Sequence, residues 1–389
     1  MTVCSKDEMV PGIFWVGAID WSVRNFHGYT TDEGSSYNAY LIMDEEPTLI
    51  DTVKAEFADQ MVERIRSVTP LSSIKFIVMN HGENDHSGAL PTLVRLMPQL
   101  VIITNEICHQ TLLALYPRLK SAKFQITHEL KLKTHSLTFV QIPMVHWPDS
   151  MITYCPEKRV VFSNDGFGQH IACSERWSDQ LIIDHVMVLA KEYMANILGL
   201  CQVPIIQALK HVVKLSFDYV LTAHGLSWRN EHIGTIVKEY ALFSENKQMK
   251  KKLTIYFCSL YGSIKAVAEQ ICQASKYPTQ LLDLKVTNIT KCALNAYDSE
   301  FLAFGCYTYN GGMNPDMESL IQYLAGLHLI RNRKVYVFGS FCYADKAVKQ
   351  MIDLITKAGG IVVGKQLYKL KADPECMYDM EDDIRKLFD

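Results

Sequence analysis

The 389-residue chain lacks the segments that mark membrane-inserted, secreted and nucleic-acid-binding proteins. It has no apolar run of about eighteen residues, the length that a membrane-spanning helix needs. Its N-terminus shows no basic segment followed by an apolar core, so no secretion signal is predicted. A formal net charge of −3 gives no attraction to nucleic acid. We therefore expect a cytoplasmic protein with no membrane and no nucleic-acid partner.

Paired cysteines are also missing. The eleven cysteines are an odd number, and no two of them form a C-x-x-C pair. This absence argues against a disulfide framework, a zinc ribbon and an iron–sulfur cluster. We expect reduced thiols that pack as small apolar side chains.

The chain is long enough, with 48% hydrophobic residues, for two or three globular domains. The clearest change in composition is Lys247–Lys252, whose sequence is KQMKKK. A solvated charge run of this kind suits a domain boundary. We predict one domain over residues 1–249 and a second over residues 252–389.

The first third of the chain is rich in predicted strands. Short apolar runs at 12–17, 38–43 and 47–51 are separated by turn residues, which predicts an antiparallel start to a sheet. Apolar residues at helical spacing predict a helix over 57–68.

The most informative stretch is Ile74–Asn80, an apolar, β-branched run that predicts a buried strand. His81, Glu83, Asp85 and His86 follow within six residues. Imidazole and carboxylate together are a ligand set for a transition metal. If the loop is extended, the first three side chains point one way and His86 points across, which suits two ions sharing one loop.

The alternative is a polar turn in which Asp85, Ser87 and Gly88 cap the next helix. Capping does not require two histidines, however. Three more predicted strands also end near a ligand type: 137–143 leads to His146, 159–163 to Asp165, and 219–222 to His224. A lone histidine, or a lone aspartate before glycine, is usually structural. Four such strand ends favour a metal centre.

This order of strands and ligands resembles the metallo-β-lactamase fold, an αββα sandwich with its metal site on loops at one edge. Members that use zinc for hydrolysis carry H-x-H-x-D-H, whereas this chain has His81-x-Glu83-x-Asp85-His86. A carboxylate in place of an imidazole adds negative charge and shifts the preference from zinc toward iron or manganese. H-x-E-x-D-H is the pattern of the flavodiiron proteins.

The resemblance implies a ligand set for two irons. One iron takes His81, Glu83, His146 and a bridging Asp165, and the other takes Asp85, His86, His224 and the same Asp165. His27 and Tyr193 match family positions beside the metals and are assigned as catalytic residues on that resemblance.

The second half has a different pattern. A predicted strand at 253–257 leads into Ser259–Ser263 and a helix at 264–271. Hydroxyls and backbone amides at a helix N-terminus form an anion site. Strands recur at 280–284, 300–305, 335–339 and 360–363, with helical patterns between them. We predict a doubly wound, parallel, five-stranded sheet.

This half resembles flavodoxin, which implies bound FMN. The implied contacts are Ser259, Leu260, Tyr261, Gly262, Ser263 and Ile264 in the phosphate loop, Tyr307, Thr308, Tyr309, Asn310, Gly311 and Gly312 after the third strand, and Ser340, Phe341, Cys342 and Tyr343 after the fourth. Two positions depart from the family: Ile264 replaces a common phosphate-binding threonine, and Cys342-Tyr343 replaces Gly-Trp. Loss of one neutral hydroxyl contact costs about 1 kcal/mol, so weaker FMN binding is expected.

Both halves together identify the chain as a member of the flavodiiron proteins. The resemblance implies an oxidoreductase that reduces dioxygen to water with four electrons and so detoxifies oxygen, or alternatively one that reduces nitric oxide to nitrous oxide. A binuclear zinc hydrolase and a pure electron carrier are the competing classes. The resemblance also implies a head-to-tail homodimer or a dimer of dimers. No rubredoxin-like cysteine pairs follow the second half, so the electron donor is expected to be separate, a rubredoxin or an NAD(P)H-dependent flavin or rubredoxin reductase.

Overall fold

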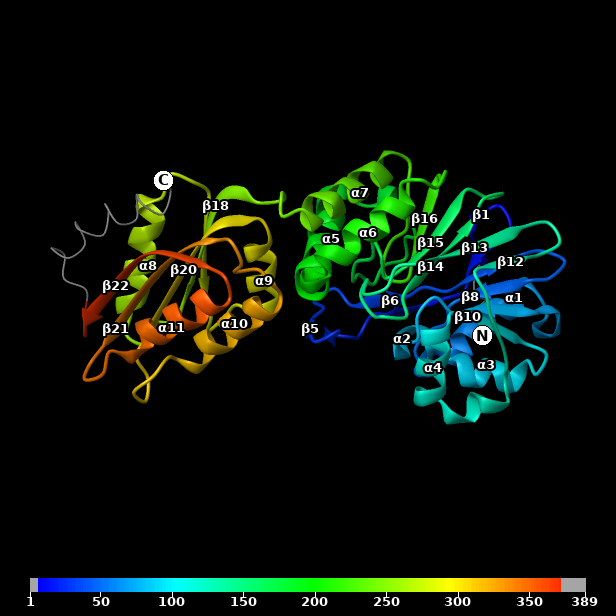
Figure 1. The fold of residues 1–389 in the computed structure, drawn as a ribbon, viewed down its shortest axis with the longest axis horizontal. Helices are drawn as coiled ribbons and strands as arrows, with labels where there is room; N and C mark the ends of the chain where they lie inside the picture. Colours follow the sequence, from blue (N-terminus) through cyan, green and yellow to red (C-terminus); the bar gives the residue numbers. More distant parts are fainter. Residues whose placement is uncertain (1–5, 372–389) are drawn as a thin grey trace. The chain divides into compact units, whose positions relative to one another are not determined.

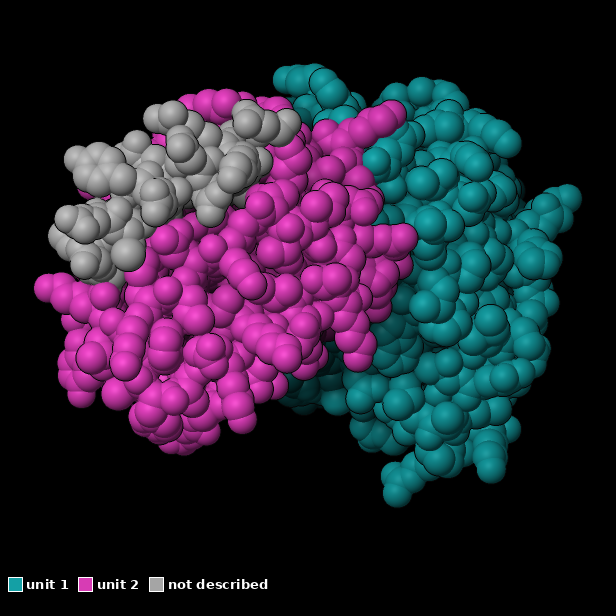
Figure 2. Space-filling model, turned by 60° about the vertical axis from the view of Figure 1, so that its left-hand side comes forward, with its two compact units in different colours: residues 1–26, 31–193, 201–245 teal, residues 27–30, 194–200, 246–389 magenta. Residues whose placement is uncertain are grey.

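The computed structural model describes residues 6–371. The chain forms two compact units, coloured separately in Figure 2. The first comprises residues 1–26, 31–193 and 201–245, and the second comprises residues 27–30, 194–200 and 246–389.

The first unit contains a seven-stranded sheet with the order β1-β2-β7-β8-β9-β10-β11 (Figure 1). Its strands are β1 (Asp7–Val10), β2 (Ile13–Trp15), β7 (Tyr40–Ile42), β8 (Thr48–Ile50), β9 (Phe76–Val78), β10 (Val101–Thr104) and β11 (Lys123–Ile126). From β1 to β8 each strand runs antiparallel to its neighbour, and from β8 to β11 the strands are parallel. The predicted antiparallel start is therefore confirmed.

A six-stranded sheet faces it, with the strands in sequence order from β12 to β17. These strands are β12 (Glu129–Lys131), β13 (Ser136–Gln141), β14 (Met151–Cys155), β15 (Val160–Asn164), β16 (Tyr219–Thr222) and β17 (Trp228–Arg229). Short strands β3 (Ala18–Asp20), β4 (Asn25–Phe26) and β6 (Ser35–Tyr37) precede β7, and β5 (Tyr29–Thr30) belongs to the second unit.

Alternation along β9 explains the layers. Ile77 packs with helices α1 (Ala58–Val68), α3 (Leu90–Leu96) and α4 (Glu106–Leu115) in one core, whereas Val78 packs in the second core with Phe139 and Phe162 of the other sheet. Helices α5 (Ile183–Ile197), α6 (Gln202–Val212) and α7 (Glu231–Ser244) accompany the second sheet (Figure 1). The first unit is thus the predicted αββα sandwich.

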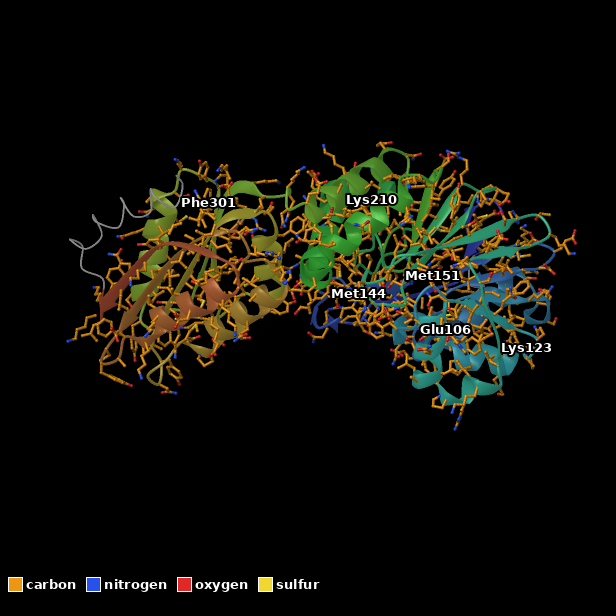
Figure 3. The ribbon with its side chains drawn as sticks, viewed as in Figure 1. Glu106, Lys123, Met144, Met151, Lys210 and Phe301 are labelled. Atoms are coloured by element: carbon orange, nitrogen blue, oxygen red, sulfur yellow. The ribbon has the colours of Figure 1, made fainter. Side chains whose placement is uncertain are left out.

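The second unit is a parallel sheet with the order β19-β18-β20-β21-β22, as predicted for a doubly wound domain. Its strands are β18 (Lys250–Phe257), β19 (Thr279–Asp283), β20 (Ser299–Tyr307), β21 (Lys334–Phe341) and β22 (Ile361–Lys369). Its helices are α8 (Ser263–Ala274), α9 (Ile289–Tyr297), α10 (Pro315–Gly326) and α11 (Lys346–Lys357). Phe301 on β20 (Figure 3) is fully buried with Ile255 and Tyr336, so this sheet has its own core.

Part of the lysine-rich boundary segment belongs to a strand, although Lys250 and Lys251 remain exposed. Lys250, Lys251 and Lys252 open strand β18. Lys251 Nζ lies 2.7 Å from a Glu300 oxygen, and Lys252 Nζ lies 2.8 Å from a carboxylate oxygen of Asp298. The charges that suggested a linker therefore pair with acidic residues at the start of the neighbouring strand β20.

The expectation for the thiols is confirmed for nine cysteines, which are all free and mostly buried, while Cys4 and Cys376 lie outside the described residues. Between residues 6 and 371, no single helix is long and apolar enough to cross a membrane. One bent pair, Ile183–Ile197 with Gly199–Val212, passes the same length and composition test only when its two helices are taken together.

Candidate metal centre

The segment after β9 is not the extended loop that the sequence suggested. Residues 84–87 form one helical turn, α2 (Asn84–Ser87), closed by hydrogen bonds from Ser87 N–H and Gly88 N–H to the carbonyls of Glu83 and Asn84, both at 2.9 Å. His81 and Glu83 precede this turn, and Asp85 and His86 lie on it. The prediction of a strict alternation of side chains along an extended loop was therefore wrong.

The capping alternative is also wrong. The next helix, α3, begins at Leu90 and has Ala89 at its N-cap, without a side-chain cap. Ser87 instead directs its hydroxyl to the carbonyl oxygens of Gly82, at 2.8 Å, and Glu83, at 2.9 Å. It stabilises the ligand loop itself.

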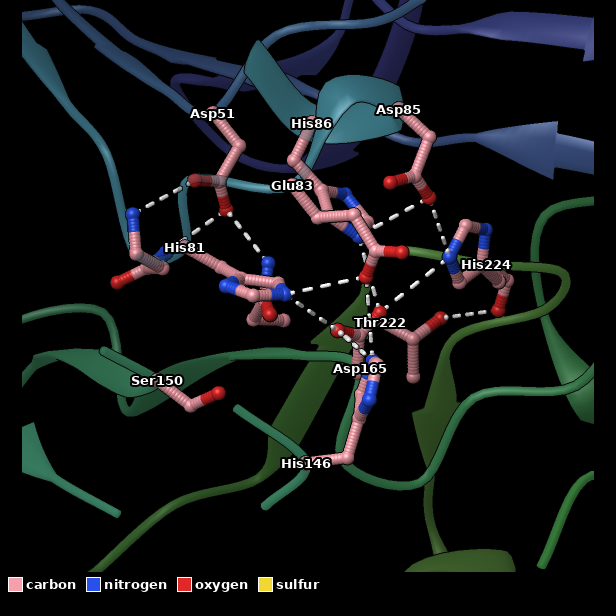
Figure 4. Close-up of polar contacts among 12 residues, drawn as sticks. Asp51, His81, Glu83, Asp85, His86, His146, Ser150, Asp165, Thr222 and His224 are labelled. Carbon is pink, nitrogen blue, oxygen red and sulfur yellow. Dashed lines mark hydrogen bonds and ion pairs between the residues drawn. The ribbon is translucent and has the colours of Figure 1, made fainter. Parts of the chain in front are cut away.

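Four of the predicted ligands meet in a first cluster, formed by His81, Glu83, His146 and Asp165 (Figure 4). The Nε2 atoms of His81 and His146 each lie 3.3 Å from Glu83 Oε2. Asp165 Oδ2 lies 3.4 Å from His146 Nε2 and 3.8 Å from His81 Nε2. Glu83 and His146 keep side-chain exposures of 21% and 13%, so this cluster is the more open of the two.

The second cluster is formed by Asp85, His86, His224 and the other oxygen of Asp165 (Figure 4). Asp85 Oδ2 lies 3.2 Å from His86 Nε2 and 3.1 Å from His224 Nε2. Asp165 Oδ1 lies 3.0 and 3.3 Å from the same two nitrogens. All four side chains are almost completely buried.

The two clusters fit a pair of metal ions bridged by Asp165. Metal–ligand bonds to nitrogen and oxygen are about 2.0–2.2 Å long, so neighbouring ligand atoms around one ion lie roughly 3 Å apart. The donor spacings above match that value, and the two oxygens of Asp165 face different clusters. Four imidazoles and three carboxylates without a thiolate suit non-haem iron.

The charge of these carboxylates also favours bound cations. Burial lowers the pKa of His146, but hydrogen bonds with Asp165 and Glu83 outweigh it and raise the pKa to about 9. For His224, burial is likewise outweighed by hydrogen bonds with Asp165 and Asp85, and the pKa rises to about 10. The same carboxylate charge that holds these protons attracts a metal ion, whose binding releases them.

Two of the predicted ligand histidines each have a hydrogen-bonding partner at Nδ1. His81 Nδ1 lies 2.8 Å from Asp149 Oδ1, and His224 Nδ1 lies 2.7 Å from the carbonyl oxygen of Ser36. These contacts place an N–H on Nδ1 and make Nε2 the nitrogen that could bind a metal ion. Asp149 also accepts the Gly82 N–H at 2.8 Å. Neither role was predicted from the sequence.

The Asp149→Asn variant is expected to bind iron about 10–100-fold more weakly, because an outer partner of a ligand histidine typically contributes this much. Competition with an iron chelator measures the affinity. Asp59→Asn, at an exposed position on α1, is the matched control. Equal iron retention in the two variants would count against the role of Asp149.

Asp51 holds the strand ends beneath the clusters together. Its Oδ1 accepts the Asn80 N–H at 2.7 Å, and its Oδ2 accepts from the side-chain amides of Asn80 at 2.9 Å and Asn164 at 3.4 Å. Asp51 follows β8, Asn80 follows β9, and Asn164 ends β15. The ligand-bearing segments are therefore fixed to one another by a buried carboxylate that the sequence did not single out.

Tyr193 and His27, the two residues predicted to be catalytic, lie in different parts of the structure. Tyr193 is buried on α5, with its ring centroid 6.3 Å from that of His224. His27 lies in the turn between β4 and β5 at a φ of 52° and belongs to the second unit. His170, which was not predicted, packs 4.8 Å from the His224 ring and shares a 2.8 Å hydrogen bond between its Nδ1 and Ser35 Oγ. A lone histidine carries no local signal, so only its packing reveals it.

In the second unit, the predicted phosphate loop leads into α8. Gly262 is the N-cap at a φ of 85°, a left-handed conformation that favours glycine, and the helix begins at Ser263. Ser259 Oγ accepts the Lys265 N–H at 3.2 Å. Ile264 is buried in the core, so its side chain does not face the loop, and only its backbone N–H is available to a phosphate. Its proposed weakening effect on FMN therefore comes only from the missing hydroxyl.

The other two predicted FMN segments lie side by side at the ends of β20 and β21. Tyr307, Ser340 and Phe341 belong to the strands themselves, not to the loops, because both parallel strands are longer than their apolar runs suggested. Thr308 N–H donates to Ser340 O at 2.8 Å and joins the two ends. Asn310 and Gly311, both at positive φ, form the tight turn between Tyr309 and Gly312.

These segments fit a flavin. The Thr308 hydroxyl is buried and makes no hydrogen bond within residues 6–371. Tyr261, Tyr309 and Tyr343 are exposed by 91%, 46% and 83%, and exposed rings can stack on a planar ligand. The polar loop and the buried hydroxyl suit the polar groups of FMN, and the exposed rings suit its planar ring system.

Comparison with known proteins matches both units. The model of the ODP family beta lactamase matches residues 36–225, and the flavodoxin model matches residues 255–386. The chain is 32% identical to a nitric oxide reductase of Moorella thermoacetica, over 90% of this chain and 92% of that protein. It is 31% identical to a rubredoxin-oxygen oxidoreductase of Megalodesulfovibrio gigas, over 90% and 89% of the two chains. The crystal structure of the flavodiiron protein from Giardia intestinalis superposes with a TM-score of 0.97 at 38% identity, covering 100% of this chain and 97% of that one.

Proposed function

Because the chain belongs to the flavodiiron protein family, we propose that it reduces dioxygen to water with four electrons and thereby detoxifies oxygen. The family makes it an oxidoreductase that acts on dioxygen or nitric oxide, with FMN and a di-iron centre as cofactors. The observation that carries the proposal is the placement of Asp165, whose two oxygens face two separate ligand clusters.

The proposed ligands are those of the two clusters. His81, Glu83 and His146 hold one iron, Asp85, His86 and His224 hold the other, and Asp165 bridges them. When bound, the pair of irons would supply two electrons and FMN two more, and these four electrons convert one dioxygen and four protons to two waters. The protein's residues orient the ligands, exclude water from the second cluster and leave the first cluster partly open.

His27 and Tyr193 are proposed to line the gas-binding side of the irons. Tyr193 is supported by its burial beside His224 and by its 5.2 Å ring contact with His170. For His27 the proposal depends on the family position.

Nitric oxide is the second candidate substrate, because one of the relatives is a nitric oxide reductase. Two nitric oxide molecules, two electrons and two protons give nitrous oxide and water at the same irons. The test is to reduce the protein under anaerobic conditions, to supply dioxygen or nitric oxide separately, and to compare the two turnovers as kcat/KM. A higher value for dioxygen supports the proposal, and a higher value for nitric oxide would replace it with the second candidate.

FMN is proposed to bind the Ser259–Ile264 loop, the Tyr307–Gly312 segment and the Ser340–Tyr343 segment, with its phosphate at the N-terminus of α8. Its electrons are proposed to come from a separate rubredoxin or rubredoxin-like donor, as the name of the Megalodesulfovibrio relative suggests. A head-to-tail homodimer is the proposed assembly.

A fragment of residues 246–389 is expected to bind FMN at micromolar concentration. The apolar cluster on the α8 face of its sheet comes entirely from residues 253–368 and does not use residues 27–30 or 194–200, the other segments of the second unit. Titration of flavin fluorescence measures the binding. The fragment with Ser259→Asp and Ser263→Asp is the control, since carboxylates suit the helix N-terminus but repel phosphate. If the folded fragment took up no more FMN than this control, the site would be wrong.

A further inference from the structure

A small cavity lies in the first unit, beside the loops that carry His146 and Asp165. Its walls come from residues on either side of these two ligands and from helices α6 and α7. They include Val145, Phe167, Ile205, Ala208, Val212 and Tyr240. The volume is about 20 Å³, which is room for one molecule the size of water or a diatomic gas.

The cavity is apolar because its two polar side chains are already hydrogen-bonded within the protein. Ser163 Oγ donates to the carbonyl oxygen of Gly166 at 2.6 Å. The Tyr240 hydroxyl oxygen accepts the Phe167 N–H at 2.8 Å. A buried water needs two to four polar partners, and these walls offer few. An apolar molecule in the cavity needs no polar partner.

The cavity shares a wall with the metal site. Asp165 lies in a tight turn in which Gly166 N–H donates to Ser163 O and Gly168 N–H donates to Asp165 O, both at 3.1 Å. The Asp165 carboxylate faces the two ligand clusters, while Ser163, Gly166 and Phe167 line the cavity. A molecule in the cavity is thus separated from the clusters by the backbone of one turn.

We propose that this cavity binds an apolar diatomic gas, dioxygen or nitric oxide, and holds it in store beside the irons. The proposal rests on the proposed function and adds a second binding position for its substrate. Water, ions and charged molecules are excluded by the apolar walls, whereas a neutral diatomic molecule loses little on leaving water.

Xenon tests the site directly, because it is apolar and needs no metal, electron donor or turnover. Crystals of the full-length, cofactor-loaded protein are pressurised with xenon and its anomalous signal is measured. A xenon peak is expected in the cavity of the unmodified protein and is expected to be lost in Ala208→Leu, whose larger side chain fills the space. An ordered water in the cavity, or no xenon peak there, overturns the proposal.

Kinetic measurements test whether gas bound in the cavity is used in turnover. Val212→Ile adds one methylene to the cavity wall and is the milder substitution if Ala208→Leu does not fold. Val203→Ile is the matched control, because Val203 lies on the same helix and is 68% exposed. The filling variants are expected to raise KM for the gas several-fold with kcat unchanged, and separate measurements with dioxygen and nitric oxide show which gas uses the cavity.

Two outcomes separate this proposal from the proposed function. If xenon binds but the filling variants keep the KM of the control for both gases, the cavity is a packing defect and the inference is wrong. If xenon binds and the protein reduces neither gas, the apolar-gas site remains and the proposed function is overturned.

Discussion

The Asp165→Ala variant is expected to lose both irons, and reductase turnover with them. The two carboxylate oxygens of Asp165 lie 3.0 Å from His86 Nε2 and 3.4 Å from His146 Nε2, so in the proposed site the substitution would remove a bond to each ion. It also leaves two positive ions with one carboxylate fewer to balance them. Iron content should fall from about two per chain toward zero, a larger loss than the roughly 10–100-fold weakening expected for an outer partner.

Metal analysis and turnover with each gas measure this result. FMN content is the internal control, since the proposed FMN loops lie in the other unit and should be unaffected. Asp59→Ala, at an exposed site on α1, is the control that shows whether loss of an aspartate outside the clusters changes iron content or turnover. If Asp165→Ala kept both irons and normal turnover, the bridging assignment would be wrong.

Mixing two inactive chains is expected to restore activity. One chain carries His81→Ala with Asp165→Ala and cannot hold iron, and the other carries Ser259→Asp with Ser263→Asp and cannot hold FMN. In a head-to-tail dimer, the flavodoxin-like domain of one chain serves the irons of its partner, twice per dimer. A mixed dimer then contains one junction with both cofactors intact and one with neither.

The size of the effect follows from counting. Random exchange makes about half of the dimers mixed, and each has one working junction of two, so about a quarter of the unmodified activity is expected. Each parent alone should stay inactive. Native mass spectrometry confirms that mixed dimers form, and if they form without any recovery, electrons do not pass between chains.

Much of the fold could be predicted from local patterns. The β-branched run before His81 predicted β9, and the alternating strands and helices after residue 250 predicted the doubly wound sheet. The ligand types could be predicted as well, because each stands near the end of a recognisable strand. The errors came where local signals are ambiguous. The Asn84–Ser87 turn has too few residues to show a period, and the charges of Lys250–Lys252 suit a linker and the exposed start of a strand equally well.

The amino-acid sequence by itself determined which residues could bind metal and on which strand ends they stand, since residue type and hydrophobic period are local properties. Only the tertiary structure decided what surrounds them. Asp149 reaches His81 across 68 positions, and the Ser36 carbonyl reaches His224 across 188. The apolar cavity likewise combines residues of β14, α6 and α7. Such contacts depend on how the layers pack, and no local period records them, because packing brings together side chains whose positions in the chain are unrelated.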